Sequence, residues 1–149
     1  MTVSRKLLCG VYGLIAVLAL VGTWANNFAY INLGFVGATL KFWPETLVNP
    51  ASRSITVDIL FLGLAVMVWM VLEARRLSIR FVWAYILAGI FIAISVAVPV
   101  FLIVRERALA AREPGAPAGS MARADAVGLV VIGLGAVAYT CASLMGVKP

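Results

Sequence analysis

Asp58 is the residue of this sequence best suited to chemistry in an apolar environment. It follows Asn49 by nine residues and stands within an apolar run that begins near Ser54. Asn49 is a favoured N-cap and Pro50 suits the first helical position, so a helix is predicted to start here. Asp58 would then lie roughly 13 Å along that helix. An acid at such a depth in lipid is costly, and it usually faces a helix bundle or a wet cavity.

Two interpretations of Asp58 stay open. In the structural interpretation, its carboxylate accepts a hydrogen bond from Ser95, Ser54 or water and fixes a pair of helices. In the functional interpretation, Asp58 is a catalytic proton donor or contacts a substrate in an outward-facing pocket. Both interpretations predict that the side chain faces the other helices and not lipid.

The third apolar run supplies candidate binding residues near Asp58. Pro99 cannot donate to the carbonyl of Ser95, which frees an acceptor and predicts a bend in the helix. Counting outward from the basic turn that precedes this run brings Asp58 and Ser95 to one level of a helical hairpin. Arg105 would lie roughly 15 Å farther out. Its pairing with Asp58 therefore needs a shorter third helix or a strong bend.

The composition indicates that these residues belong to a membrane protein. Of 149 residues, 64% are hydrophobic and only 12% are charged, against about 25% charged in soluble domains. The basic residues stand at the ends of apolar runs, which is typical of membrane topology and unlike a nucleic-acid-binding patch. The absence of histidine excludes a histidine-ligated haem or zinc site, and Cys9 and Cys141 lack metal-site spacing. We expect the lipid bilayer as partner, no nucleic acid, no metal and no cofactor.

Four apolar runs approach the roughly 20 residues that a helix needs to cross the hydrocarbon core. The predicted fold class is therefore all-α, an integral membrane bundle of four transmembrane helices in a single domain, 1–149. The first run is long for a signal-peptide core, so a retained anchor is expected and cleavage is the alternative. The fourth run follows a charged linker rich in Pro, Gly and Ala, and is interpreted as a possible accessory span. The spans cover about 7–24, 54–72, 81–104 and 124–147, with the linker at 105–123.

An aromatic segment joins the first two runs. It reads ANNFAYINLGFVGATLKFWPETLV, and aromatic rings prefer the level of the headgroups. We predict a partly helical segment in the outer interface, from Phe28 to Trp43, that does not cross the membrane. A re-entrant loop, or the lid of a pocket with Trp43 as a binding residue, is the alternative.

Basic residues predict the orientation. The short link EARRLSIR between the second and third runs is basic, and within it Glu73 and Arg76 are interpreted as an i, i+3 pair at a solvated helix end. The count of basic residues ties at six on each side, but their density near the helix ends favours two cytoplasmic termini. The loops at 25–53 and 105–123 would then face outward.

The middle of the chain carries a distinctive series of short motifs. From Asn49 to Glu106 it reads NP, then Asp58, EARRL, VWAY and SVAVPVFLIVRE. This pattern resembles a family of small uncharacterised bacterial membrane proteins, known as a domain of unknown function. The resemblance covers roughly the first 110 residues, implies a bacterial inner-membrane location and carries no reaction. A fainter similarity, to small membrane terpene cyclases that protonate an apolar substrate with acids near helix ends, is an analogy only.

Three hypotheses for the function follow. The first is a non-enzymatic membrane protein, either an accessory subunit of a larger membrane complex or a self-associating homo-oligomer. The alternative is a membrane enzyme acting on a lipid or isoprenoid ligand, with Asp58 catalytic. In that case the candidate binding residues are Ser95, Pro99, Trp43 and Arg105. An oligomeric transporter is the third, disfavoured because the first span contains no acid. Whether the protein is an enzyme stays open.

Overall fold

The computed structural model of this chain describes residues 1–112 and eight single positions beyond them: 123, 127, 130, 131, 134, 137, 138 and 141. The elements formed by residues 1–112 are all helices, which confirms the predicted all-α class. Three helical stretches are long and apolar enough to cross a membrane: Val3–Glu45, Pro50–Leu77 and Val82–Arg112. The predicted fourth span, 124–147, falls outside the continuously described residues.

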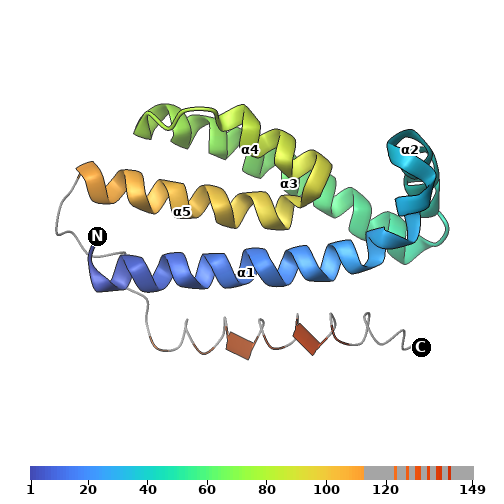
Figure 1. Cartoon of the computed structure of the whole chain (residues 1–149), viewed down its shortest axis with the longest axis horizontal. Helices are drawn as coiled ribbons and strands as arrows, with labels where there is room; N and C mark the ends of the chain where they lie inside the picture. The colour runs from blue at the N-terminus through green and yellow to red at the C-terminus, as the bar shows by residue number, and fades with distance from the viewer. Residues whose placement is uncertain are drawn as a thin grey trace.

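The first stretch contains three consecutive elements. Helix α1 (Val3–Asn27) continues into the 3-10 helix η1 (Phe28–Leu33) and then into α2 (Gly34–Glu45). The Tyr30 hydroxyl donates to the Glu45 carboxylate, so η1 and α2 are packed together. Figure 1 shows α2 at the end of α1 that is distant from the N-terminus. The prediction of a partly helical aromatic segment is therefore confirmed, and its position in the outer interface stays a prediction.

Helix α3 (Pro50–Leu77) starts as its sequence predicts. The side-chain oxygen of Asn49 accepts a hydrogen bond from the Ser52 N–H at 2.8 Å, which satisfies one of the free donors of the first turn. Its 28 residues make it roughly 42 Å long. That length exceeds the hydrocarbon core of about 30 Å, so α3 is long enough to cross a membrane with both ends beyond the core.

The turn that follows α3 has an unusual backbone. Ser78 and Phe81 both adopt left-handed conformations, with φ of 57° and 59°. Ser78 ends α3 in a Schellman-type arrangement, in which the Ile79 N–H donates to the Ala74 carbonyl at 2.8 Å. The two left-handed residues reverse the chain direction within a few residues, so the next helix starts beside the end of α3.

The third stretch contains helix α4 (Val82–Ala88), the π-helical turn η2 (Gly89–Ala93) and helix α5 (Ile94–Arg112). Figure 1 shows α5 returning alongside α4 instead of extending it. α5 also packs along α1 in the opposite direction. At the far end of this pair, the Trp24 indole N–H donates to the Ile92 carbonyl at 3.3 Å.

Side-chain distances establish that this third stretch folds back on itself. Tyr85 and Phe101 would lie roughly 24 Å apart in one straight helix, yet their ring centroids are 5.7 Å apart. A Cβ added at Gly89 would lie 3.5 Å from the Cβ of Ala97, eight residues later. The reversal occurs at η2, earlier than the bend that was predicted at Pro99.

The core lies where α3, α4 and α5 meet. Phe101 is completely buried there, and its ring makes edge contacts with Trp69 at 5.8 Å and Tyr85 at 5.7 Å. This arrangement of aromatic rings is favourable beyond the area that it buries. The other buried members of the cluster are Met70, Ala74, Val82 and Ile86.

The fold-back corrects the predicted course of residues 105–112. They were expected to face outward, at the opposite end from Glu73, but Arg105 and Glu73 form an ion pair at 2.7 Å. The physical reason is that hydropathy measures how apolar a segment is, but it does not show whether the chain continues straight or reverses within that segment. A straight span and a hairpin within the same environment therefore have the same composition.

Candidate functional site

Five charged side chains form a continuous network at the end of the bundle that holds the N-terminus. Arg76 and Glu73 come from α3, Arg105 and Glu106 from α5, and Arg5 from α1. They connect in the order Arg76, Glu73, Arg105, Glu106, Arg5, so arginines and glutamates alternate. The network joins three helices.

Each carboxylate accepts hydrogen bonds from two arginines. Glu73 Oε1 accepts from Arg105 Nε and from Arg76 Nη2, each at 2.7 Å, and its Oε2 accepts from Arg76 Nε at 2.7 Å. Glu106 Oε2 accepts from Arg5 Nη1 at 2.7 Å, and its Oε1 from Arg105 Nη1 at 2.9 Å. Arg105 therefore bridges the two acids with different nitrogens of one guanidinium.

The network is largely buried. Arg5, Glu73 and Glu106 are 5%, 7% and 4% exposed, and they are the buried charged residues of the described chain. Burying a charge is costly unless it is paired and hydrogen-bonded. Because each acid is already engaged by two arginines, the network is suited to joining helices and supplies no free general base.

Local sequence explains how one short segment of α5 reaches two neighbours. Successive helical residues point about 100° apart, so Arg105 is directed towards Glu73 of α3 while Glu106 is directed towards Arg5 of α1. Glu73 and Arg76 pair at the i, i+3 spacing that the sequence predicted. The prediction of a solvated pair is wrong for Glu73, because Arg105 covers it.

Asp58 lies outside this network. It is exposed on α3, and no other residue of the described chain hydrogen-bonds to it. The prediction that it faces the other helices is therefore wrong. The hairpin turns too early to cover it, since α5 begins at Ile94, whose side chain reaches Gly63 of α3. Neither interpretation finds its expected contact among the described residues, so a structural or catalytic role for Asp58 stays a prediction that requires a partner outside them.

The candidate binding residues do not gather into one site. Ser95 is exposed on α5, and Pro99 is buried within the same helix. Trp43 lies on α2, in edge contact with Phe42 at 5.7 Å, at the opposite end of the bundle from Arg105. Arg105 belongs to the ion-pair network and is paired with Glu73 of α3, whereas the sequence predicted a position roughly 15 Å beyond the level of Asp58.

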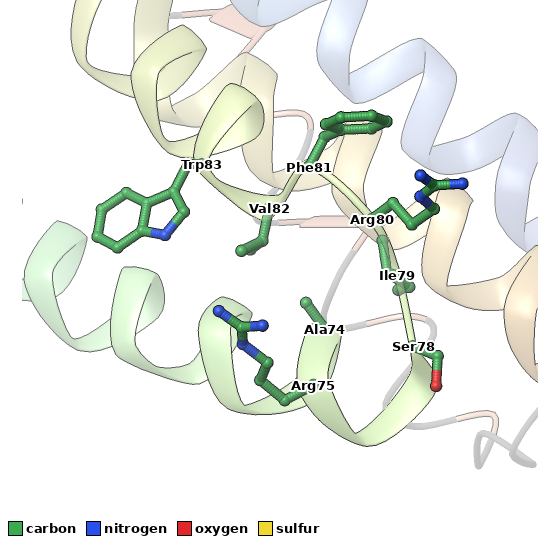
Figure 2. Close-up of a pocket in the computed structure, with 8 residues that line it drawn as sticks. All are labelled: Ala74, Arg75, Ser78, Ile79, Arg80, Phe81, Val82 and Trp83. Atoms are coloured by element: carbon green, nitrogen blue, oxygen red, sulfur yellow. The ribbon is translucent and has the colours of Figure 1, made fainter.

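A pocket of about 500 Å³ lies at the turn between α3 and α4. Figure 2 shows Arg75 and Trp83 directed to one side of this turn, and Arg80 and Phe81 away from them. Only the basic character of the turn was visible in the sequence, because the pocket depends on the two left-handed residues. It is lined by Ala74, Arg75, Ser78, Ile79, Arg80, Phe81, Val82 and Trp83.

The model of a family described as "Protein of unknown function DUF2834" matches residues 11–107. The matched region contains α3, the hairpin and four of the five network residues, all but Arg5. No curated protein and no solved structure matches the chain.

Proposed function

Because the chain belongs to the DUF2834 family of proteins of unknown function, we propose a function from its own geometry: a non-enzymatic, multi-pass protein of the bacterial inner membrane that associates with a second copy of itself. The observation that supports this proposal is the exposed Asp58. An acid on the apolar surface of a membrane helix needs a polar partner, and a second copy of the same helix would supply one.

The depth of Asp58 makes a partner necessary. It lies 15 residues from Glu73, or roughly 22 Å along α3. If Glu73 marks one edge of a hydrocarbon core of about 30 Å, Asp58 lies inside the opposite edge. An aspartate at the centre of a membrane helix costs about 2.5–3.5 kcal/mol on insertion scales, and less towards the boundary. A hydrogen bond from a neighbouring helix would reduce this cost.

The exposed face of α3 has the spacing of a helix-pairing seam. Six exposed residues alternate at intervals of four and three, which is the heptad pattern of paired helices. In a parallel pair, the Asp58 carboxylate lies one turn from the partner's Ser54 and can accept from its hydroxyl. A single polar position in such a seam fixes the register of the pair. The seam consists of Ser54, Asp58, Phe61, Ala65, Val68 and Leu72.

The orientation belongs to the same proposal. Within residues 1–112, the end that holds the N-terminus carries eight basic residues and the opposite end carries two, because the hairpin returns residues 105–112 to the N-terminal end. Such an excess favours a cytoplasmic position for that end. The cytoplasmic group is Arg5, Lys6, Arg75, Arg76, Arg80, Arg105, Arg107 and Arg112, against Lys41 and Arg53 at the other end.

The test is the association of full-length protein in liposomes, measured by energy transfer between donor- and acceptor-labelled copies over a range of protein-to-lipid ratios. We expect Asp58→Leu to weaken association about three- to tenfold, the range of an interhelical hydrogen bond in a membrane. Asp58→Asn should keep the association, because an amide also hydrogen-bonds. Ile59→Leu, exposed on α3 outside the seam, is the matched control.

Two results would contradict the proposal. One is a wild-type protein that stays monomeric at every ratio. The other is an Asp58→Leu variant that associates as tightly as the Ile59→Leu control. Asp58→Asn also distinguishes this proposal from the enzyme hypothesis, in which Asp58 is a proton donor. That hypothesis expects this variant to fold and associate normally but to lose activity towards an apolar lipid or isoprenoid.

A further inference from the structure

Two donors at the turn between α3 and α4 have no hydrogen-bond partner among the residues that the structure describes. They are the guanidinium of Arg75 and the indole N–H of Trp83, both exposed. The adjacent Arg76 differs, since it donates twice to Glu73. Figure 2 shows Arg75 and Trp83 on the same side of the turn, from α3 and α4 respectively.

We propose that this pocket binds the phosphate of an anionic phospholipid, with Arg75 and the Trp83 N–H as donors. The pocket of about 500 Å³ is lined by two arginines and by no acid. Arginine suits phosphate because its planar guanidinium offers parallel N–H donors. Tryptophan suits the membrane boundary because its ring lies among apolar chains while its N–H reaches the headgroups.

Arg80 contributes charge from the other side of the turn. Its guanidinium lies 5.5 Å from the centre of the Phe81 ring, which is within the range of a cation–π contact. No residue of the described chain forms a salt bridge with it. Arg80 therefore raises the positive potential at the pocket, while Arg75 and Trp83 make the direct contacts.

The surface next to the pocket favours a lipid over a soluble phosphate. Trp83, Leu87 and Ile90 follow one another at helical spacing from the pocket along α4 and η2, and they are 61%, 49% and 59% exposed. Such a stripe is continuous with the hydrocarbon of a bilayer and can contact the acyl chains of a lipid whose headgroup lies at Arg75. Basic pockets between membrane helices at the cytoplasmic face bind anionic headgroups in this way.

The backbone prepares the pocket in advance. Ser78 and Phe81, which line it, are the two described residues other than glycine with positive φ. Left-handed conformations are sparsely populated, and they persist where the surrounding structure determines them. The turn therefore fixes the separation of Arg75 from Trp83 before a ligand arrives, which reduces the ordering cost of binding.

The test is native mass spectrometry of the full-length protein, released from detergent after equilibration with phosphatidylglycerol or with phosphatidylcholine of the same chain length. We expect wild type to retain phosphatidylglycerol preferentially. Arg75→Gln should lower that retention about tenfold, the effect of losing a charge-assisted hydrogen bond. Trp83→Phe, which keeps an aromatic ring but removes the N–H, should lower it about threefold.

Arg107→Gln is the matched control, because Arg107 is exposed at the same end and carries the same charge, but lies outside the pocket. Its retention should equal that of wild type, and unchanged helical circular dichroism verifies the fold of each variant. If Arg75→Gln and Arg107→Gln lowered phosphatidylglycerol retention equally, the binding would come from general attraction to the basic end and not from this pocket. That result would overturn the proposal. Equal retention of the two lipids would do the same. Displacement by millimolar inorganic phosphate would reassign the pocket to a soluble anion.

Discussion

At the scale of residues, the central feature is the alternation of acids and arginines in the network. Glu106, 4% exposed, is bonded to Arg5 and Arg105. Removing one member of a buried network leaves the remaining charges unpaired, which is more damaging than losing a surface pair. The network should therefore contribute to stability through all its members together and not through one ion pair at a time.

We expect Glu106→Gln to destabilise the protein by about 3–5 kcal/mol, because Arg5 would stay buried without its carboxylate. Thermal unfolding in mild detergent, followed by circular dichroism, measures the change. The control is Glu45→Gln, which removes the charge from the exposed pair with Lys41 but keeps an amide oxygen that can accept from Tyr30, and it should change stability by less than about 1 kcal/mol. Equal shifts for the two variants would show that the network is not a stabilising unit.

The members of this network were visible in the sequence, but their pairing was not. Glu73, Arg76 and Arg105 each stood out near the end of an apolar run, and Arg105 with Glu106 closed the family-like motif. A straight third helix would place Arg105 at the opposite end from Glu73, whereas the hairpin brings the two together. Asp58 was misjudged for the same reason, because its expected neighbours on the third span turn back before they reach it.

At the scale of elements, helix starts were predictable and the reversal was not. Asn49 and Pro50 specify the start of α3 through local hydrogen bonding and a fixed φ, which single residues encode. The reversal at η2 depends instead on α5 packing against α4, including the close approach of Ala97 to Gly89. That is a contact between residues distant along a helix, and the run that contains it is uniformly apolar.

The hairpin can be tested with the double variant Gly89→Cys and Ala97→Cys, in a background with Cys9 and Cys141 replaced by serine. The Cβ separation of 3.5 Å at this pair is within the range of a disulfide, so mild oxidation should form an intramolecular bond. Mass measurement after alkylation detects it. A pair at Gly10 and Leu18 of α1, also eight residues apart, should stay reduced, since it spans roughly 12 Å. If both pairs stay reduced, residues 82–112 form a straight helix.

At the scale of the whole molecule, charge is concentrated at one end. The topology expected from the sequence places equal numbers of basic residues on the two sides of the membrane. The return of α5 brings Arg107 and Arg112 to the end that holds Arg80. Arg112 lies there because its guanidinium donates to Ser78 at 3.2 Å. The predicted span 124–147 lies beyond this point. The expectation of two cytoplasmic termini depends on that span and stays a prediction.

The orientation is tested by single cysteines at exposed positions, labelled with a membrane-impermeant maleimide in cells and in inverted vesicles. We expect Arg80→Cys and Arg107→Cys to react only from the cytoplasmic side, because both lie at the basic end. Lys41→Cys should react only from the outer side. If Arg107→Cys reacted from the outer side, as Lys41→Cys should, the result would contradict the hairpin. It would support the sequence-based prediction that residues 105–123 face outward.

The hairpin also has a consequence for how the chain is inserted during synthesis. A straight third span would oblige the insertion machinery to carry Arg105, Glu106, Arg107 and Arg112 through the bilayer. Charged side chains are unfavourable in the hydrocarbon core, so they oppose such a transfer. In the orientation proposed above, α4 and α5 enter and leave the membrane by the same face, so these charged groups stay on the side where the ribosome delivers them. Within residues 1–112, the proposed orientation then requires translocation of only the segment between α1 and α3, which carries Lys41, together with the first turn of α3, which carries Arg53.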